Sequence, residues 1–321
     1  MKQKLIFLIS FLLFTACSDS SSSRSRSPTA SPYCNEIYVG ELSGPLLVFS
    51  RTDTGDVAPK RTITSVTDIQ GIAVDTVNGE IWTTQNSGHS ITVYSRSANG
   101  AATPLRTIVG ASTTLNGPAG IAVDTTNNLV YVANGGAHSV LVFSRTANGD
   151  TAPIRSISGA FTTFNLPWDV ALDLTNNEII IANFGNGSVD SFPSSASGDV
   201  SPSRTLTGAG AFGSPLTVIV DPTNNEIIAT DPNDILRIFP RTANATAAYT
   251  RQLTGAATTL STPGFAAVDY IHDELITPQS ASGQILTFDR TAADNTAPIR
   301  TISGAATLLV SPKSVAVTPC N

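Results

Sequence analysis

The chain has 321 residues, of which 41% are apolar and 13% charged, and its formal net charge is −6. That length suits one large domain or two ordinary ones, with enough apolar residues for a sizeable core. The acidic balance, with arginines spread evenly along the chain, argues against nucleic-acid binding. Sustained helical periodicity with caps at both ends is absent, so we expect short strands and turns.

Residues 1–16 are typical of a secretory signal peptide. Lys2 and Lys4 precede an apolar run that is too short to span a bilayer, which needs about 20 residues. The run ends in Phe14-Thr-Ala-Cys17, which resembles a bacterial lipobox, although Phe14 stands where Leu is usual. The resemblance implies that Cys17 carries the lipid and begins the mature chain. Ordinary secretion with an incidental Cys17 is the alternative.

Residues 17–32 form a Ser-rich segment that cannot bury a core, so we expect a flexible tether after the lipid attachment site. Ser18, directly after the cysteine, resembles lipoproteins exported to the outer membrane of Gram-negative bacteria. We therefore expect the membrane to be one partner, through the lipid anchor. The expected location is the bacterial cell envelope, at the outer membrane, on its periplasmic or its surface side.

The remaining residues, 33–321, form a repeat array. A short apolar run ends in an Asp, and this Asp recurs with spacings of 49, 49, 48 and 48 residues. Its positions are Asp75, Asp124, Asp173, Asp221 and Asp269. One more step reaches Thr318, so the array continues to the end of the chain. A period of this length accommodates four short strands.

The stretch 120–159 shows the repeating unit most clearly, with four apolar runs separated by turn-forming residues. The first run is apolar on both faces, which predicts a strand buried on both sides. Ala122 at its centre fits crowding near an axis. The Asp-Thr-Thr-Asn-Asn sequence that follows is typical of a tight hairpin, so we predict a turn role for the repeated Asp rather than a catalytic one.

Four antiparallel strands repeated radially make the blade of a β-propeller. The segments GIAVD, LVYVAN and VLVFSR resemble the NHL/YVTN-type group of TolB-like propellers, and the resemblance covers 33–321. It implies an all-β, six-bladed propeller of four-stranded antiparallel blades. It says little about activity, because many functions share this fold. The recurring arginines, such as Arg145 and Arg155, are expected to stack and pair between neighbouring repeats.

The chain contains five complete repeats and two fragments. The N-terminal fragment supplies the last three strands, at 37–40, 46–50 and 61–64, and the C-terminal fragment supplies only the first strand, at 314–318. We expect the C-terminal strand to pair with the N-terminal strands in one blade. This pairing closes the ring and removes two exposed sheet edges.

Two of the three cysteines flank this closure. Aligned to the repeat, Cys34 and Cys320 fall side by side in the turn where the chain is cut. We predict a disulfide between them, because an exported protein meets an oxidising compartment. Two unpaired thiols are the alternative.

The mouth of the central channel is the default ligand site of a propeller. The residue that ends each second strand is polar, and together these residues form a column: Glu41, Gln85, Asn134, Asn183, Asp231 and Gln279. At the start of the first strand, Asp169, preceded by Trp168, departs most from the repeat. Repetition explains a recurring residue, so positions that vary are the better functional candidates. We predict these eight residues as the binding site.

Oxygen ligands around a channel could hold Ca²⁺, and related six-bladed lactonases and lyases place a divalent metal there. The chain has no motif that fixes metal ligands by spacing, so no cofactor is predicted and Ca²⁺ remains the alternative. His89 and His138 occupy equivalent loop positions, where we expect loop hydrogen bonds. An acid–base pair, as the resemblance to virginiamycin-type lyases suggests, is the alternative. His272 lies at the opposite mouth.

Asp190 and Arg237 replace apolar residues at equivalent positions of the third strand in consecutive repeats. They could pair with each other or line a local polar patch.

We interpret the chain as a membrane-tethered, extracytoplasmic binding or scaffold module. We expect a monomer whose channel mouth contacts a protein, peptide or glycan and does not bind nucleic acid. The competing interpretation is a metal-dependent lactonase or lyase of the six-bladed propeller type, and the sequence favours the binding module.

Overall fold

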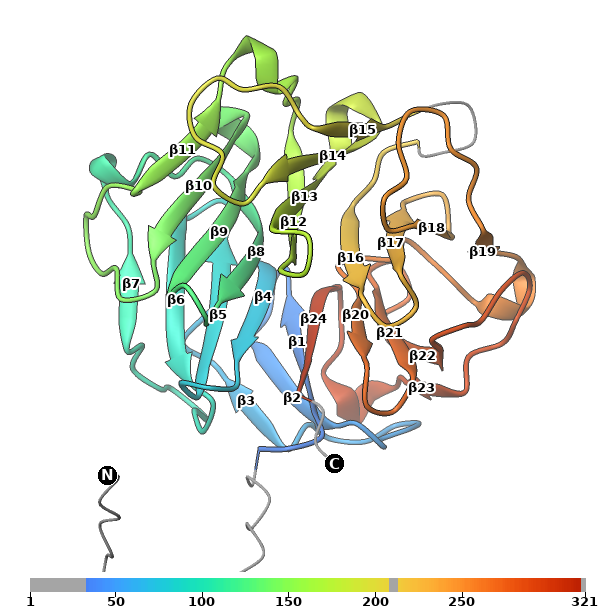
Figure 1. Cartoon of the computed structure of the whole chain (residues 1–321). Coiled ribbons are helices and arrows are strands. Elements are labelled where there is room, and N and C mark those ends of the chain that lie inside the picture. The colour runs from blue at the N-terminus through green and yellow to red at the C-terminus, as the bar shows by residue number, and fades with distance from the viewer. Residues whose placement is uncertain (1–32, 208–212, 319–321) are drawn as a thin grey trace, which may run out of the picture. The chain divides into compact units, whose positions relative to one another are not determined.

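The computed structural model describes residues 33–207 and 213–318, which form six four-stranded antiparallel sheets around a central axis (Figure 1). The predicted six-bladed β-propeller is therefore confirmed. Blades 1 to 5 are each built from four consecutive strands, and blade 6 combines the last strand with the first three. The predicted signal peptide, Cys17, the tether and Cys320 lie outside the described residues.

The strands of each blade follow one another from the axis outward. Blade 1 contains β4 (Ile69–Asp75), β5 (Glu80–Gln85), β6 (Ser90–Ser95) and β7 (Arg106–Ile108); blade 2 contains β8 (Pro118–Asp124), β9 (Leu129–Asn134), β10 (Ser139–Ser144) and β11 (Arg155–Ser158); blade 3 contains β12 (Pro167–Asp173), β13 (Glu178–Asn183), β14 (Ser188–Pro193) and β15 (Arg204–Leu206). Blade 4 contains β16 (Thr217–Asp221), β17 (Glu226–Asp231), β18 (Ile235–Pro240) and β19 (Arg251–Leu253); blade 5 contains β20 (Ala267–Asp269), β21 (Glu274–Gln279), β22 (Gln284–Asp289) and β23 (Arg300–Ile302); blade 6 contains β24 (Pro312–Thr318), β1 (Glu36–Glu41), β2 (Leu46–Ser50) and β3 (Arg61–Ile63). Short 3-10 segments occupy the loops: η1 (Ala111–Thr113), η2 (Gly135–Ala137), η3 (Ala160–Thr162), η4 (Phe184–Asn186), η5 (Ala256–Thr258) and η6 (Ala305–Thr307).

Blade 6 closes the ring as predicted. β24 runs antiparallel to β1, with Glu36 opposite Thr318. The Asn35 N–H donates to the Thr318 carbonyl at 2.7 Å, and Thr318 Oγ1 donates to the Tyr33 carbonyl at 2.9 Å. Both ends of the propeller therefore meet where the other blades have a hairpin turn.

The turn role predicted for the repeated Asp is also confirmed. In blade 1, Asp75 Oδ1 accepts the N–H groups of Val77 and Asn78, at 2.9 and 2.8 Å. In blades 2 to 5 the residue three positions after the Asp makes the same backbone bond. Gly79 completes the turn at φ +69°, and the other blades place Asn or Asp there, residues that tolerate this backbone region.

The hydrophobic core lies between the blades. Six clusters of buried side chains each span two neighbouring blades. Between blades 1 and 2, for example, Trp82 and Val93 pack with Val130 and Phe143. Because each blade packs on both of its faces, its central strands carry apolar side chains on both sides.

The recurring arginines pair between neighbouring repeats, as the sequence predicted, and others pair within their own repeat, which it did not predict. The Arg after the third strand reaches the Asp that ends the innermost strand of the preceding blade. The Nε–Oδ2 distance is 3.4 Å in Arg241–Asp173. The Arg that begins the fourth strand pairs with the Glu that begins the second strand of its own blade, as in Arg204–Glu178 at 2.6 Å. These charges therefore stabilise the ring and do not form a basic patch.

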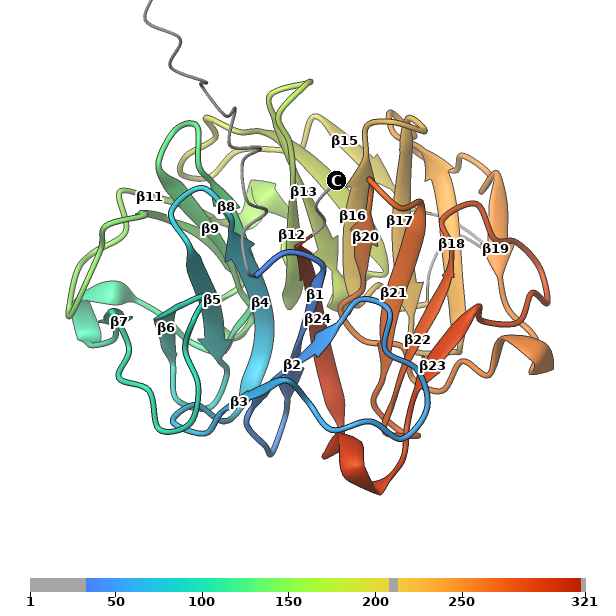
Figure 2. The same ribbon diagram turned by 90° about the horizontal axis from the view of Figure 1, so that it is seen from below.

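The ring has two faces, which lie on opposite sides in Figure 2. The turn face carries the hairpins between the first and second strands, and β1 begins and β24 ends on this face. The loop face carries the loops that lead from each fourth strand to the next innermost strand. Within the described ranges, none of the helical segments is long and apolar enough to cross a membrane.

Candidate functional site

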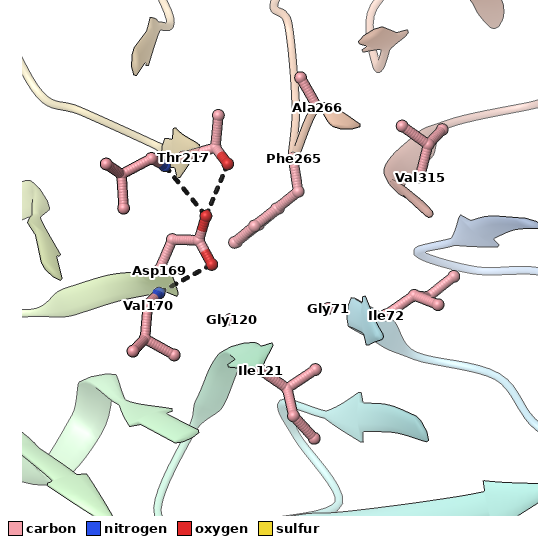
Figure 3. Close-up of a pocket in the computed structure, with 11 residues that line it drawn as sticks. Gly71, Ile72, Gly120, Ile121, Asp169, Val170, Thr217, Phe265, Ala266 and Val315 are labelled. Carbon is pink, nitrogen blue, oxygen red and sulfur yellow. Dashed lines mark hydrogen bonds between the residues drawn. The ribbon is translucent and has the colours of Figure 1, made fainter. Parts of the chain in front are cut away.

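The innermost strands enclose a cavity of about 130 Å³ on the propeller axis (Figure 3). Two consecutive positions of these strands line it. The first position contributes Gly71, Gly120, Asp169, Thr217 and Phe265, and the second contributes Ile72, Ile121, Val170, Val218, Ala266 and Val315. The second position forms an apolar ring. Among the described residues that line the cavity, Asp169 is the one with a charged side chain.

Asp169 joins blades 3 and 4 at the axis. Its Oδ2 accepts hydrogen bonds from Thr217 Oγ1 at 2.6 Å and from the Val218 N–H at 3.0 Å. Its Oδ1 accepts the Val170 N–H at 2.8 Å. Figure 3 shows the carboxylate held by these bonds beside the Phe265 ring. A methyl group on Gly120 would lie 2.0 Å from Oδ1, so the carboxylate needs glycine in the neighbouring blade.

Burial raises the pKa of Asp169 to about 7, although its three hydrogen bonds act in the opposite direction. An acid whose folded pKa exceeds its unfolded pKa stabilises the fold through its protonated form, and this contribution disappears as the pH rises through the folded pKa. We expect the free energy of unfolding of the native chain to fall, relative to Asp169→Asn, between about pH 4 and pH 8. Urea unfolding of both proteins across this range measures the difference, and a difference independent of pH would contradict the raised pKa.

The innermost strands of three blades contain a β-bulge one residue before the positions that line the cavity. Pro167 pairs with Asn183 and Asp169 with Ala182, so Trp168 is an extra residue of β12 that has no partner position on β13. The same shift makes Gln70 the extra residue in blade 1 and Lys313 in blade 6. Bulges re-aim side chains and are common beside active sites. Trp168 was among the predicted residues, whereas Gln70 and Lys313 were missed. Variation at the position before the aligned strand was the available signal.

Two of these bulge residues have a polar atom without a hydrogen-bond partner in the described structure. Gln70 is 3% exposed, yet its Nε2 has no hydrogen-bond partner among the described residues, and the same is true of Trp168 Nε1. Burial lowers the pKa of Lys313. A buried polar atom without a partner costs about 1–3 kcal/mol, so these two donors are incompletely satisfied within the described structure.

The predicted column of strand-end residues holds the loops of the loop face. The side-chain oxygens of four members each accept the N–H of the residue 18 positions earlier, at 2.6–2.8 Å. These four are Asn134, Asn183, Asp231 and Gln279. Each bond fixes the loop that precedes an innermost strand. The column thus recurs in these four blades because each uses the same loop support.

The other two members bind differently. Glu41 accepts the Ser311 N–H at 2.7 Å, which is the same type of contact across the chain closure. Gln85 bonds within its own blade, donating to Thr83 Oγ1 at 2.8 Å and accepting from Ser90 Oγ at 3.2 Å. All six members are buried and none lines the axial cavity. Of the eight predicted site residues, the structure places Asp169 in the cavity, whereas the Trp168 ring does not line the cavity and lies 5.7 Å from the Phe184 ring, centre to centre.

The two equivalent histidines also support loops, as expected. His89 Nδ1 accepts the Gly117 N–H and His138 Nδ1 accepts the Leu166 N–H, each at 2.9 Å. Asp234 makes the matching bond to the Thr262 N–H at 2.7 Å in blade 4. The contact therefore follows the repeat, and each ring is committed to its own loop.

The comparisons with known proteins agree with this architecture. Residues 115–143 and 164–189 match the NHL repeat family, and these two stretches fall at equivalent positions of blades 2 and 3. Two of the six blades thus carry a match to the NHL repeat. A chain in the crystal structure of a nidogen/laminin complex is 13% identical, with a TM-score of 0.63 over 89% of this chain and 99% of that chain. At that identity the likeness shows the fold alone. The curated proteins contain no match.

Asp190 and Arg237 do not pair with each other in the propeller. Asp190 Oδ2 accepts from Asn183 Nδ2 at 2.9 Å, whereas Arg237 Nη1 lies 3.4 Å from Asp231 Oδ2. Asp190 thus binds the column residue of blade 3, and Arg237 binds the column residue of blade 4. Burial raises the pKa of Asp190, against the effect of its hydrogen bonds.

Potential metal ligands are dispersed over the described part of the propeller. Over 33–207 and 213–318, His, Cys, Asp and Glu side chains do not gather in groups of three or more that could hold a metal ion. The lactonase or lyase alternative therefore gains no support from these residues.

Proposed function

We propose that this chain is an extracytoplasmic binding or scaffold module, tethered to a membrane through Cys17. In this proposal its axial cavity takes the cationic tip of a side chain from a protein or peptide partner. The observation that carries the proposal is the carboxylate of Asp169, the one acidic side chain among the described residues that line the cavity. The equivalent position holds Gly, Thr, Phe or Ser in the other blades, so the blade fold does not require an acid there.

The chemistry of the cavity favours a cation. A carboxylate offers about four acceptor positions, and the structure fills three of those on Asp169. A protonated amine would occupy the fourth position and form a charge-assisted hydrogen bond, which is roughly twice as strong as a neutral one.

Cell-envelope location and the closing disulfide belong to the same proposal. Export through the signal at 1–16 would bring Cys34 and Cys320 into an oxidising compartment, where a structural disulfide persists. The hydrogen bonds between Asn35, Thr318 and Tyr33 support it, because they fix the chain next to Cys34 against the strand that leads to Cys320.

A small probe tests the cavity. We expect n-butylammonium to bind the native chain with a dissociation constant in the millimolar range, the scale reached by a ligand of a few heavy atoms. Asp169→Asn keeps the side-chain shape and removes the charge, so it should weaken binding about tenfold or more. The indole N–H signals in an NMR titration report the event, because Trp168 adjoins Asp169 and the chain has 2 Trp residues.

The pH dependence provides the control. Only ionised Asp169 attracts the ammonium, so the affinity should rise from pH 5 to pH 8 through its raised pKa of about 7. Neutral 1-butanol should bind weakly and without this dependence. Equal affinity for the two probes, or an unchanged affinity in Asp169→Asn, would show that the cavity is not a cation site.

A further inference from the structure

The turn face carries an apolar hollow that the loop supports and the axial cavity do not explain. Its volume is about 240 Å³, and the apolar residues that line it are Leu172, Leu174, Val220, Pro222 and Tyr270. It extends over the turns of blades 3, 4 and 5 and lies on the opposite side of the ring from the loops.

Its lining departs from the repeat. The residue after the aligned Asp is Thr76 in blade 1 and Thr125 in blade 2, but it is Leu174, Pro222 and Tyr270 in blades 3 to 5. Leu174 is 51% exposed, Tyr270 41% and Ile271 44%. Threonine satisfies the same turn elsewhere, so the fold does not require apolar side chains here. We call Leu174, Pro222, Tyr270 and Ile271 the apolar arc.

The charged side chains next to the arc bind one another. Arg241 binds Asp173, and Arg290 binds both Asp221 at 3.2 Å and Asp273 at 2.5 Å. The Tyr270 hydroxyl donates to the Val220 carbonyl at 2.6 Å, and the Arg290 guanidinium lies 5.9 Å from the centre of the Tyr270 ring. An aromatic ring held in this way, beside exposed aliphatic groups, suits a boundary between water and hydrocarbon.

The path of the chain indicates what this face meets. Tyr33, the first described residue, lies on the turn face, because its carbonyl accepts from Thr318 Oγ1 at the closure. The proposed lipid on Cys17 lies 16 residues before it in the sequence. A flexible segment of that length has a root-mean-square span of about 22 Å and a maximum of about 55 Å. An anchor at Cys17 would therefore keep the turn face, rather than the loop face, close to the bilayer.

We propose that the turn face docks on the surface of a lipid bilayer, with the apolar arc inserted among the headgroups. This inference rests on the lipid anchor of the proposed function. It would leave the loop face, with the axial cavity below it, directed away from the membrane and accessible to a partner.

Vesicle binding tests the face separately from the anchor. The protein is the chain from Ser18 onward, which keeps the whole propeller and lacks the acylated cysteine. We expect it to co-sediment with vesicles of phosphatidylethanolamine and phosphatidylglycerol. Leu174→Ser with Ile271→Ser should weaken this association about tenfold or more, since each change removes an inserted aliphatic side chain.

The matched control is Phe161→Ser with Val310→Ser, because these side chains are 66% and 76% exposed and lie on the loop face. This variant should bind as the parent does, and all three proteins should unfold at the same denaturant concentration. Absence of vesicle binding by the folded parent, or equal losses in both variants, would overturn the docking proposal. Mass spectrometry of the Cys17 peptide from the full chain tests the anchor independently.

Discussion

Replacing Cys34 and Cys320 together by Ser is expected to lower the free energy of unfolding by up to about 5 kcal/mol. The predicted disulfide closes a loop that contains almost the whole propeller. In the chain-entropy account, the gain grows with loop length because the cross-link restricts the unfolded chain more than the folded one. The disulfide would also stabilise the chain closure in blade 6, where the pairing of β1 with β24 joins the two ends of the ring.

Denaturant unfolding of the chain from Ser18 onward measures this effect. Cys34 and Cys320 are then the only cysteines, since the sequence has 3 and Cys17 is absent. Reductant should destabilise the parent to the level of the double Ser variant and leave that variant unchanged. Two titratable thiols in the unreduced, denatured parent would contradict the disulfide.

Replacing Glu36 by Gln is expected to cost about 3–5 kcal/mol, the range for breaking a buried ion pair from one side. The Glu36 side chain is fully buried. Its carboxylate binds Arg61 through two bonds, at 2.6 and 2.8 Å, and accepts from Tyr38 Oη at 2.7 Å and Lys60 Nζ at 3.2 Å. Glutamine keeps the shape of the side chain but leaves the Arg61 guanidinium buried without its charge partner.

The pH dependence of this loss is opposite in sign to that at Asp169. Burial raises the pKa of Glu36, but the hydrogen bonds from Arg61 and Tyr38 and the charge of Arg61 outweigh it, so the pKa lies below its usual value. The carboxylate therefore contributes stability above its unfolded pKa, near 4.5, and this contribution is lost as the pH falls through the folded pKa. The difference between Glu36→Gln and the parent should shrink in acid.

Two further variants give reference values for the loss of stability in Glu36→Gln. Lys60→Met removes a partner whose side chain is 41% exposed, and should change the free energy of unfolding by at most about 1 kcal/mol. Glu178→Gln changes the equivalent residue of blade 3, whose side chain is 13% exposed, and should cost less than Glu36→Gln. If the three variants lose equal stability, the burial and the four donors around Glu36 do not determine its contribution.

One irregularity of the repeat has a tertiary explanation. Blade 2 has Leu129 where other blades begin the second strand with Glu, and blade 3 has Ser194 where other blades place Arg after the third strand. In blades 1 and 2 the corresponding residues, Glu80 and Arg145, bind each other at 3.0 Å. Both members of a pair between blades are thus replaced together at the next interface, so neither charge is left buried alone.

The column of Glu41, Gln85, Asn134, Asn183, Asp231 and Gln279 shows how a polar pattern can support two interpretations. In the sequence, six polar strand ends around one axis indicated a binding ring. In the structure they lie one strand away from the axis, where five accept loop N–H groups and Gln85 bonds within its own blade. Sequence spacing gives the blade and the strand of each residue, but it does not give the partner of its side chain.

The amino-acid sequence by itself determined the number of blades, the strand order, the closing blade and the turn role of the repeated Asp. These features follow from local periodicity and turn chemistry, which repeat every 48 or 49 residues. The tertiary structure decided which polar groups face the axis. Whether Asp169 reaches the cavity depends on the bulge at Trp168, on the space left by Gly120 and on the donors of Thr217 and Val218. These residues lie in three different blades, and only the closed ring brings them together.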